Sequence, residues 1–166
     1  MAKLHSGSST ETVKTCIFCL IAHDQDKETE VIKENRELVC FRDIVPAAPH
    51  HYLVVPKQHI QSCLSLQSRH IHLVERMAEM GKAVLHDQGI TDMKDIRYED
   101  SLGFHQPPYT SVDHLHLHVL APASQIYKDM EYKFILRSNR FVTEQCLQKH
   151  LKDNAPPVQD ALCLPL

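Results

Sequence analysis

The stretch from His114 to Leu120, HLHLHVL, places three histidines at every second position, with aliphatic residues between them. Successive side chains of a β-strand point to opposite faces of the sheet. One face of this strand would therefore carry the imidazole rings of His114, His116 and His118, and the other face would be aliphatic. Three adjacent buried imidazoles would each need a polar partner, so we expect the imidazole face to line a site and the aliphatic face to enter the core. The alternatives are an exposed strand face rich in histidine, or an adventitious metal chelator.

The chemistry that suits such a row is nucleophilic attack on phosphorus. A neutral imidazole is a nucleophile near neutral pH, and its attack on a phosphoryl group gives a covalent phospho-imidazole. His116 has a histidine on each side and is the expected nucleophile. His118 is expected to donate a hydrogen bond to a nonbridging oxygen, where charge develops during the attack.

Length, charge and cysteine content bound the class of protein. The chain has 166 residues, enough for one domain with a core, and a net charge of -3 without a dense block of lysine and arginine. This balance argues against nonspecific binding to nucleic acid or to an anionic membrane. Because we find neither an apolar run of ~20 residues nor the apolar segment of a secretory signal, a cytoplasmic or nuclear location is expected. Six cysteines are then more typical of thiols or metal ligands than of a disulfide framework.

The hydrophobic pattern predicts an α+β fold with a mainly antiparallel sheet, because groups of strands are separated by helices. The best helix is 68–88, whose apolar residues recur every three or four positions, with Ser68 as its expected cap and Gly89 after its end. A short helix or turn is expected at 16–22, and a C-terminal helix at 143–152. Strands are expected at 30–33, 38–42, 51–55, 96–105, 110–121 and 132–138.

Three segments resemble those of a known family. HLHLHVL resembles the H-x-H-x-H-x-x signature of the histidine triad superfamily, and CFRDIVPAAPHHYLVVPKQHI at 40–60 resembles the upstream signature of its nucleotide-binding branch. CIFC at 16–19 resembles the N-terminal start of that branch. The resemblance implies a histidine-triad (HIT-like) fold with one long helix and short helices near both ends. We therefore expect four parts: a disordered lead at 1–14, the HIT domain at 15–123, a strand and helix extension packed on it at 124–154, and an irregular tail at 155–166.

The resemblance also implies an activity, which is hydrolysis or transfer at the α-phosphate of purine nucleoside monophosphates linked to an amine or an acyl group. His116 would then form an adenylyl-histidine that water cleaves, His118 would contact the α-phosphate, and His114 would orient the row. His51 matches a histidine that supports the catalytic ring, and Ser111 matches a serine that assists the leaving group. For His51 the alternative is an ordinary histidine on a strand.

The same resemblance assigns a nucleotide pocket. Asp43 matches a residue that accepts hydrogen bonds from the ribose hydroxyls, which suits a carboxylate. Four apolar residues would line the base pocket: Ile17, Phe18, Phe41 and Ile44. The alternatives are ordinary core positions for these side chains and a turn-capping role for Asp43.

Two features depart from the family pattern. Pro108-Tyr109-Thr110 stands where the best-known branch has a glycine-rich GGQ, and prolines remove N–H donors and stiffen a loop. The usual asparagine of the preceding strand is also missing, with Gly103 or His105 in that region, and Arg97–Leu102 is longer than the pattern. We therefore expect the loop to bind phosphate differently, which leaves the preference for the leaving group open, and no function follows for Arg97–Leu102.

A second constellation is a candidate metal site. Cys16 and Cys19 form a C-x-x-C pair, a weak motif alone, and His59 and His114 complete a Cys₂His₂ set. Zinc takes this ligand set tetrahedrally, and a closed site of four protein ligands is structural. Family members that resemble this pattern include some with zinc there, where it would pin the N-terminal segment onto the triad strand. The alternatives are buried free thiols or a redox dithiol, and catalysis itself is expected to need no cofactor.

The leading hypothesis for function is an enzyme, a purine nucleoside phosphoramidase that also hydrolyses acyl-adenylates. A second hypothesis is a deadenylase of adenylated nucleic-acid ends, against which the acidic balance and the lack of a basic module argue. A third is a nucleotide-binding scaffold whose catalysis is incidental. The expected partners are a purine nucleotide substrate and further copies of the chain, as a homodimer or a higher homo-oligomer, without membrane or nucleic acid.

Overall fold

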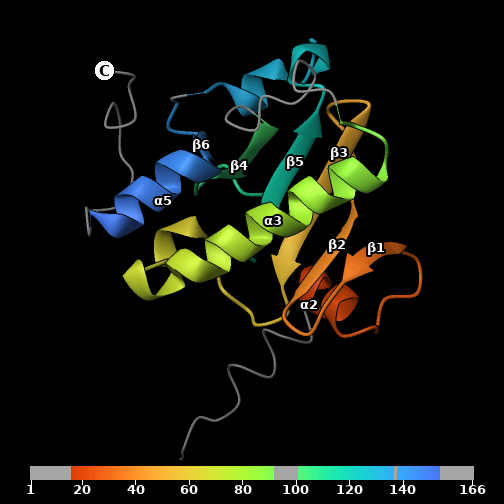
Figure 1. Cartoon of the computed structure of the whole chain (residues 1–166), viewed down its shortest axis with the longest axis horizontal. Helices are drawn as coiled ribbons and strands as arrows, with labels where there is room; N and C mark the ends of the chain where they lie inside the picture. The colour runs from red at the N-terminus through yellow and green to blue at the C-terminus, as the bar shows by residue number, and fades with distance from the viewer. Residues whose placement is uncertain (1–15, 92–100, 137, 154–166) are drawn as a thin grey trace, which may run out of the picture.

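A computed structural model describes the chain at residues 16–91, 101–136 and 138–153. The lead expected at 1–14, the tail expected at 155–166 and most of Arg97–Leu102 lie outside these residues. The described part has the α+β fold that the sequence predicts, with one six-stranded sheet, one long helix and short helices towards both ends (Figure 1).

All neighbouring strands of the sheet are antiparallel, in the order β1-β2-β3-β5-β4-β6. Because β5 pairs with both β3 and β4, the strand that ends the histidine row lies inside the sheet rather than at its edge. The strands are β1 Val31–Glu34, β2 Leu38–Arg42, β3 His50–Pro56, β4 Leu102–His105, β5 Leu117–Ala121 and β6 Phe141–Thr143. The first three confirm predicted strands, and β4 confirms the described end of the strand predicted at 96–105.

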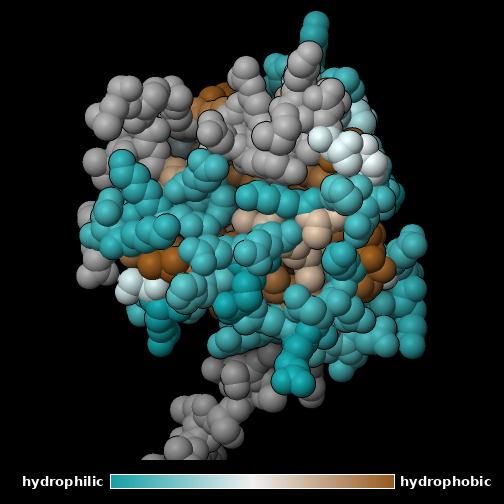
Figure 2. Space-filling view, in the orientation of Figure 1, coloured by the Kyte–Doolittle hydropathy of each residue, from teal (hydrophilic) through white to brown (hydrophobic). Residues whose placement is uncertain are grey.

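The long helix α3, Ile71–Asp87, lies across one face of the sheet (Figure 1), and its outer surface is mostly hydrophilic (Figure 2). Its end is confirmed, because Gly89 follows with a φ of 84°, which favours glycine. Its start differs from the prediction, since Ser68 opens a short 3₁₀ turn that Gln67 caps. Most of the buried residues recur every three or four positions, and together they pack on the sheet as one core: Leu73, Val74, Met77, Ala78, Met80, Gly81, Val84 and Leu85.

The histidine row lies partly before the strand, which corrects the strand predicted at 110–121. Only β5 pairs with its neighbours, because the Leu115 N–H donates instead to the carbonyl of Ile60 in a loop. The side chains still alternate: Leu115, Leu117 and Val119 enter the core beneath α3, and the histidines between them face the other side. The two-faced character predicted for HLHLHVL is therefore confirmed.

The C-terminal extension has its strand in a different place from the prediction. The strand predicted at 132–138 is wrong: Glu131–Phe134 form a 3₁₀ helix, Phe134 packs on histidine rings and Ile135 is exposed. The strand is instead β6, which pairs with β4. The predicted helix follows as α5, Glu144–Lys152, and the side chain of Thr143 caps its start.

Two close contacts hold outer segments onto the sheet, β6 at one end of the sheet and a short helix at the other. A Cβ at Gly103 would lie 2.3 Å from the ring of Phe141, so a glycine is needed for this ring of β6 to pack against β4. At the other end, the short helix α2, Ile17–Ala22, places Phe18 against the sheet face that α3 does not cover. Among the helices that the structure describes, none is long and apolar enough to cross a membrane.

Candidate active site

The sheet face opposite α3 carries histidines from three neighbouring strands. His51 comes from β3, His105 from the end of β4 and His118 from β5, and His116 lies two residues before His118. The centroids of the His116 and His118 rings are 5.0 Å apart, and those of His105 and His118 are 4.5 Å apart. The strand order β3-β5-β4 therefore gathers rings that the sequence keeps far apart.

A backbone carbonyl fixes the tautomer of His116. Its Nδ1 lies 2.6 Å from the carbonyl oxygen of His114, which can only accept, so Nδ1 carries the proton. In the neutral ring, Nε2 then holds the lone pair. Burial lowers the pKa of His116 below its usual value, and the hydrogen bond to His114 opposes this shift. The ring is therefore neutral near pH 7, with a lone pair available for attack.

Three further histidines form a hydrogen-bonded chain with a fixed direction. At one end the N–H of Ala47 donates to Nδ1 of His51 (2.9 Å), and at the other end Nε2 of His105 lies 2.7 Å from the carbonyl oxygen of Lys133. Between them, Nε2 of His51 lies 2.9 Å from Nδ1 of His118, and Nε2 of His118 lies 3.0 Å from Nδ1 of His105. One assignment satisfies all four bonds: every Nε2 donates, every Nδ1 accepts, and all three rings are neutral.

Burial is the main reason why these rings stay neutral. It lowers the pKa of His51 to about 3 and that of His105 to about 4, and it lowers the pKa of His118 well below its usual value. The charges that neighbouring histidines would carry add to all three shifts, whereas the bond to the Lys133 carbonyl opposes the shift of His105. A protonated ring would have two donors and no acceptor, so a proton added to the chain would break one of its bonds.

Acid is therefore expected to destabilise the fold below about pH 6.5. An unfolded histidine titrates near 6.5, whereas His51 and His105 titrate near 3 and 4 in the fold, so the unfolded state binds more protons as the pH falls. This stability is fully present above pH 6.5 and is lost as the pH falls towards 4, by up to about 1.4 kcal/mol per pH unit for each ring. Urea unfolding between about pH 7.5 and about pH 5 measures the loss.

Two variants assign this pH dependence to the histidine chain. His105→Gln keeps a donor and an acceptor but removes one titrating ring, so it should reduce the pH dependence of the unfolding free energy. His86→Gln changes an exposed histidine of α3 and should leave that dependence unchanged. The same dependence in all three proteins would contradict the assignment.

Both ring nitrogens of His118 are occupied, by His51 and His105. A phosphate contact by His118 therefore requires one bond to be exchanged, and His105 is the half-buried partner whereas His51 is buried. No role for His105 was expected from the sequence. In the sequence it is only one of two residues in the region of the family's missing asparagine, and the strand pairing that brings β4 beside His118 is a tertiary feature.

Asp43 faces the histidines from the end of β2. One carboxylate oxygen lies 3.3 Å from Nε2 of His51, and the other accepts a hydrogen bond from the N–H of Val45. Burial raises the pKa of Asp43, and the bond from Val45 and the charge of Lys133 oppose this. Asp43 therefore makes the turn-capping contact that was the alternative to ribose binding. Its carboxylate also lies beside the histidines.

The four residues expected to line a base pocket form two pairs. Phe18 and Phe41 are buried and pack edge to face, with centroids 5.4 Å apart, and Phe18 lies 5.1 Å from the ring of His116. Ile17 and Ile44 are exposed, Ile44 at 96%. Phe18 and Phe41 therefore belong to a core cluster, which was the alternative to a base-pocket role. Ile17 and Ile44 are accessible to a ligand.

The loop after β4 presents side chains in place of a glycine-rich backbone. The N–H of Tyr109 donates to the carbonyl of Gln106 in a turn, and the ring of Tyr109 is 39% exposed. Ser111 is exposed before the row, and within the described residues its side chain makes no hydrogen bond. The structure therefore places Ser111 on the loop that leads into the row, without a hydrogen bond to His116.

The other end of the row meets the predicted metal ligands. Sγ of Cys16 and Sγ of Cys19 lie 3.4 and 3.5 Å from Nδ1 of His114, and Nδ1 of His59 lies 3.3 Å from Sγ of Cys19. All four ligand atoms lie within 4.8 Å of one another. Nε2 of His114 donates to the carbonyl of Pro56 (2.8 Å), which turns the Nδ1 lone pair towards the thiols. These four residues could therefore hold a metal ion.

The cysteines of the described residues differ in their surroundings. Cys16, Cys19, Cys40 and Cys63 are free, whereas Cys146 is disulfide-bonded, against the expectation of free thiols. Burial raises the pKa of Cys40 and Cys63 to about 12, which makes these thiols unreactive. The pKa of Cys19 is also raised to about 12, first by burial and then by Cys16. A bound cation would offset this cost, because it stabilises the thiolate.

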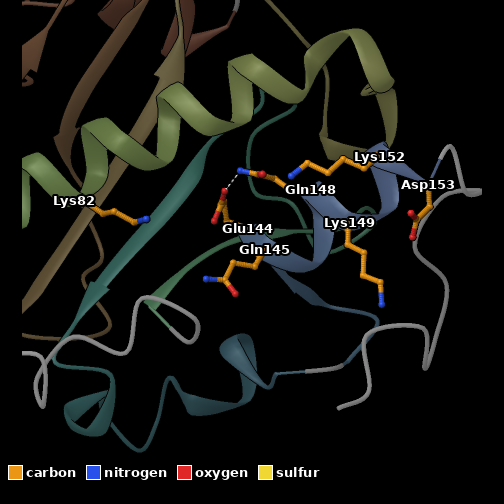
Figure 3. A pocket seen from close by; sticks show the side chains of 7 residues that line it. All are labelled: Lys82, Glu144, Gln145, Gln148, Lys149, Lys152 and Asp153. Carbon is orange, nitrogen blue, oxygen red and sulfur yellow. Dashed lines mark hydrogen bonds between the residues drawn. The ribbon is translucent and has the colours of Figure 1, made fainter. Parts of the chain in front are cut away.

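A cleft between α3 and α5 has a different chemistry. It encloses about 470 Å³, and Figure 3 shows Lys82 reaching it from α3 while the other side chains come from α5 and its end. Its lining is Lys82, Glu144, Gln145, Gln148, Lys149, Lys152 and Asp153. Glu144 accepts a hydrogen bond from Gln148. Because this lining holds neither a histidine nor a thiol, the cleft is separate from the candidate active site.

Comparisons with known proteins address the family and the fold. Residues 15–133 match the family model described as scavenger mRNA decapping enzyme C-term binding. The chain is 58% identical to the adenosine 5'-monophosphoramidase HINT3 of Danio rerio over 132 residues, which cover 80% of this chain and 79% of the relative. It is 46% identical to the adenosine 5'-monophosphoramidase HINT3 of Mus musculus over 128 residues, which cover 72% of this chain and 75% of the relative.

A solved structure gives the same result for the fold. A histidine triad protein from Clostridium difficile aligns with a TM-score of 0.56 and 29% identity, covering 64% of this chain and 89% of that chain. The histidine row and the cysteine pair both lie within the residues that the family model matches. The chain therefore belongs to the histidine triad superfamily.

Proposed function

We propose that this chain is an adenosine 5'-monophosphoramidase, which hydrolyses the P–N bond between AMP and an amine and also cleaves acyl-adenylates. The observation that carries the proposal is the state of His116. Its ring is buried and neutral, and Nε2 is left with the lone pair because Nδ1 donates to the His114 carbonyl. The HINT3 relatives of Danio rerio and Mus musculus carry this activity in their names.

The reaction takes two balanced steps. Nε2 of His116 attacks the α-phosphorus, a bond between this nitrogen and phosphorus forms, and the bond to the amine breaks as the amine takes up a proton from solvent water. Water then attacks the adenylyl-histidine and returns one proton to the solvent, so that the bond to His116 breaks and AMP leaves. The hydrogen bond from Nδ1 to the His114 carbonyl stabilises the positive charge that the ring gains on attack. The sum is one AMP amide and one water giving AMP and the free amine.

The hydrogen-bonded chain of neutral histidines explains how His118 can donate a hydrogen bond to the phosphate. His51 holds Nδ1 of His118 as an acceptor, so Nε2 of His118 already carries a proton. When substrate binds, this Nε2–H exchanges its bond to His105 for a bond to a nonbridging oxygen. His51 is thus a positioning residue for His118, and no proton has to move before the attack.

The remaining residues bind the nucleotide and the leaving group. Asp43 accepts from the ribose hydroxyls, since one of its oxygens lies at the histidine chain and its side chain is 15% exposed. The base lies on the apolar residues beside Phe18, with Ile44 as an exposed wall. Ser111, on the exposed loop, assists the departing amine.

The metal cluster holds a structural zinc ion in this proposal. The donor set fits zinc, because two thiols and two imidazole nitrogens converge within 4.8 Å and the His114 tautomer is already set for a ligand. Zinc there would tie α2 to the row and hold His114, so that the carbonyl that orients His116 stays in place. All four positions are filled by protein, so the ion has no catalytic step.

The oligomeric state and the cellular location of the protein remain predictions from the sequence. The expected homodimer would have to use a surface other than the β4 edge or displace β6, because β6 pairs with β4 in this chain. The cytoplasmic or nuclear location and the division into four parts are likewise expectations from the sequence.

Turnover of adenosine 5'-phosphoramidate tests the proposed function. We expect release of AMP and ammonia over many turnovers by the wild-type chain. An oligonucleotide with an adenylated 5' end, offered at the same concentration, tests the deadenylase alternative and should be turned over more slowly. AMP binding without turnover of either compound would contradict the proposal and favour a scaffold.

A further inference from the structure

Two tyrosines and two cations gather beside His105, at the end of the row away from the metal cluster. The guanidinium of Arg140 lies 4.4 Å from the centroid of the Tyr109 ring and 5.4 Å from that of Tyr132. The ammonium of Lys133 lies 5.9 Å from the centroid of Tyr132. Tyr109 and Tyr132 are 39% and 50% exposed. We call these four residues the aromatic–cationic shelf, and the mechanism above does not use it.

Backbone hydrogen bonds tie the shelf to the histidine chain. The carbonyl of Lys133 accepts from Nε2 of His105 (2.7 Å), and the carbonyl of Arg140 accepts from the N–H of Gln106 (2.8 Å). His105 in turn bonds to His118. The shelf is therefore fixed one imidazole ring away from the residue assigned to the α-phosphate.

The charges of the shelf act on the site. After burial, the positive charges of Lys133 and Arg140 contribute to the lowered pKa of His105, and the charge of Lys133 also acts on Asp43. Neither cation forms an ion pair with a carboxylate in the part of the chain that the structure describes. A guanidinium that packs on aromatic rings keeps its N–H edge for a planar anion such as a carboxylate or a phosphate.

We propose that the shelf is the leaving-group subsite and that it selects an amine that carries a carboxylate and an aromatic ring, which is an aromatic amino acid linked through its amino group to AMP. This deepens the proposed function and rests on it. The carboxylate pairs with Arg140 and Lys133, and the ring packs on Tyr109. In this proposal the loop Pro108-Tyr109-Thr110 contributes to leaving-group binding, because it supplies the Tyr109 ring where the family pattern has glycine.

The test compares two conjugates of AMP that differ only in a carboxylate, one with phenylalanine and one with phenethylamine. The ratio of kcat/KM is measured in the wild-type chain, and the ratio of Kd is measured in His116→Ala, which keeps both conjugates intact. We expect the carboxylate to improve both values by about 10-fold, as for a charge-assisted pair, and Arg140→Met to bring both ratios to about 1. Arg76→Met, which removes an arginine paired with Glu37 on the α3 side, is the matched control and should keep both ratios.

The aromatic part of the proposal has its own comparison. The conjugate of alanine keeps the carboxylate and lacks the ring, so the wild type should prefer the phenylalanine conjugate severalfold, and Tyr109→Ala should remove that preference. An AMP-capped oligonucleotide, which presents phosphates in place of the carboxylate, distinguishes the source of the anion. Tighter binding of the oligonucleotide than of the phenylalanine conjugate would assign the cations to a nucleic acid and overturn the proposal.

The outcomes separate the subsite from the proposed function. A Kd ratio near 1 in His116→Ala, or a ratio that survives in Arg140→Met, would overturn the subsite even if the wild type cleaves both conjugates. If the wild type cleaves neither conjugate, the phosphoramidase function fails, and the Kd ratio still decides whether the shelf binds the carboxylate.

Discussion

A His116→Ala variant is expected to hydrolyse adenosine phosphoramidates about 10⁴-fold more slowly than the wild type, because no other ring can replace its nucleophile. His118 has both nitrogens in the histidine chain, and the Nδ1 lone pair of His114 points to the thiols. The kcat of purified protein, followed by release of AMP at saturating substrate, measures the loss. The affinity for AMP should change little, because the backbone and Phe18 are unaffected.

His50→Ala is the matched control for this variant. His50 is also a histidine of β3, but it bonds to the hydroxyl of Tyr52, a residue of the core beneath α3, and so lies on the opposite face from His51. The control should keep kcat within a few-fold. A His116→Ala protein that retains wild-type kcat, or an equal loss in His50→Ala, would contradict the assignment of the nucleophile.

Loss of the metal site is expected to have the second large effect, on stability. Cys19→Ser should remove one zinc ion per chain and lower the free energy of unfolding by about 3 kcal/mol or more, which for a domain of this size is roughly 10 °C in Tm. The physical reason is that Cys16 and the two histidines would converge without a cation to hold α2 on the sheet. Metal analysis of the purified protein and a thermal melt with and without a chelator measure both effects.

Cys40→Ala is the control for the metal site. Cys40 is a buried free thiol of β2 that packs in the core, so the variant should lose some stability through a small cavity but keep its metal. Wild-type protein that contains no zinc and is unaffected by a chelator would contradict the zinc proposal and leave the cysteine pair as buried thiols.

The alternation of histidine and aliphatic residues at every second position was sufficient to predict an imidazole face and an aliphatic face for this stretch. Alternation is a local property, so it holds even though only β5 pairs as a strand and His114 and His116 precede it. The long helix and its end at Gly89 were predicted for the same reason, because the helical spacing of apolar residues and a glycine after the last turn are local signals. The C-x-x-C pair and the resemblance to the histidine triad superfamily together gave the candidate metal ligands, which the fold brings together from three separate segments.

What the sequence did not reveal depends on contacts between distant segments. The apolar run at 132–138 looked like a strand, but Phe134 is anchored on the histidine rings and the next residue is exposed. Gly103 gave no sign that it accommodates the ring of Phe141. The role of His105 was invisible for the same reason, because its partners are a ring on another strand and a carbonyl 28 residues later.

The most direct test of the account is rapid-quench mass spectrometry of the wild-type chain mixed with an adenosine phosphoramidate. The account predicts a transient added mass of one adenylyl group, located by peptide mapping on His116 and absent from His116→Ala. AMP release without any adenylyl-protein at the earliest times, or an adduct on another residue, would contradict the central claim that the Nε2 lone pair of His116 is the nucleophile.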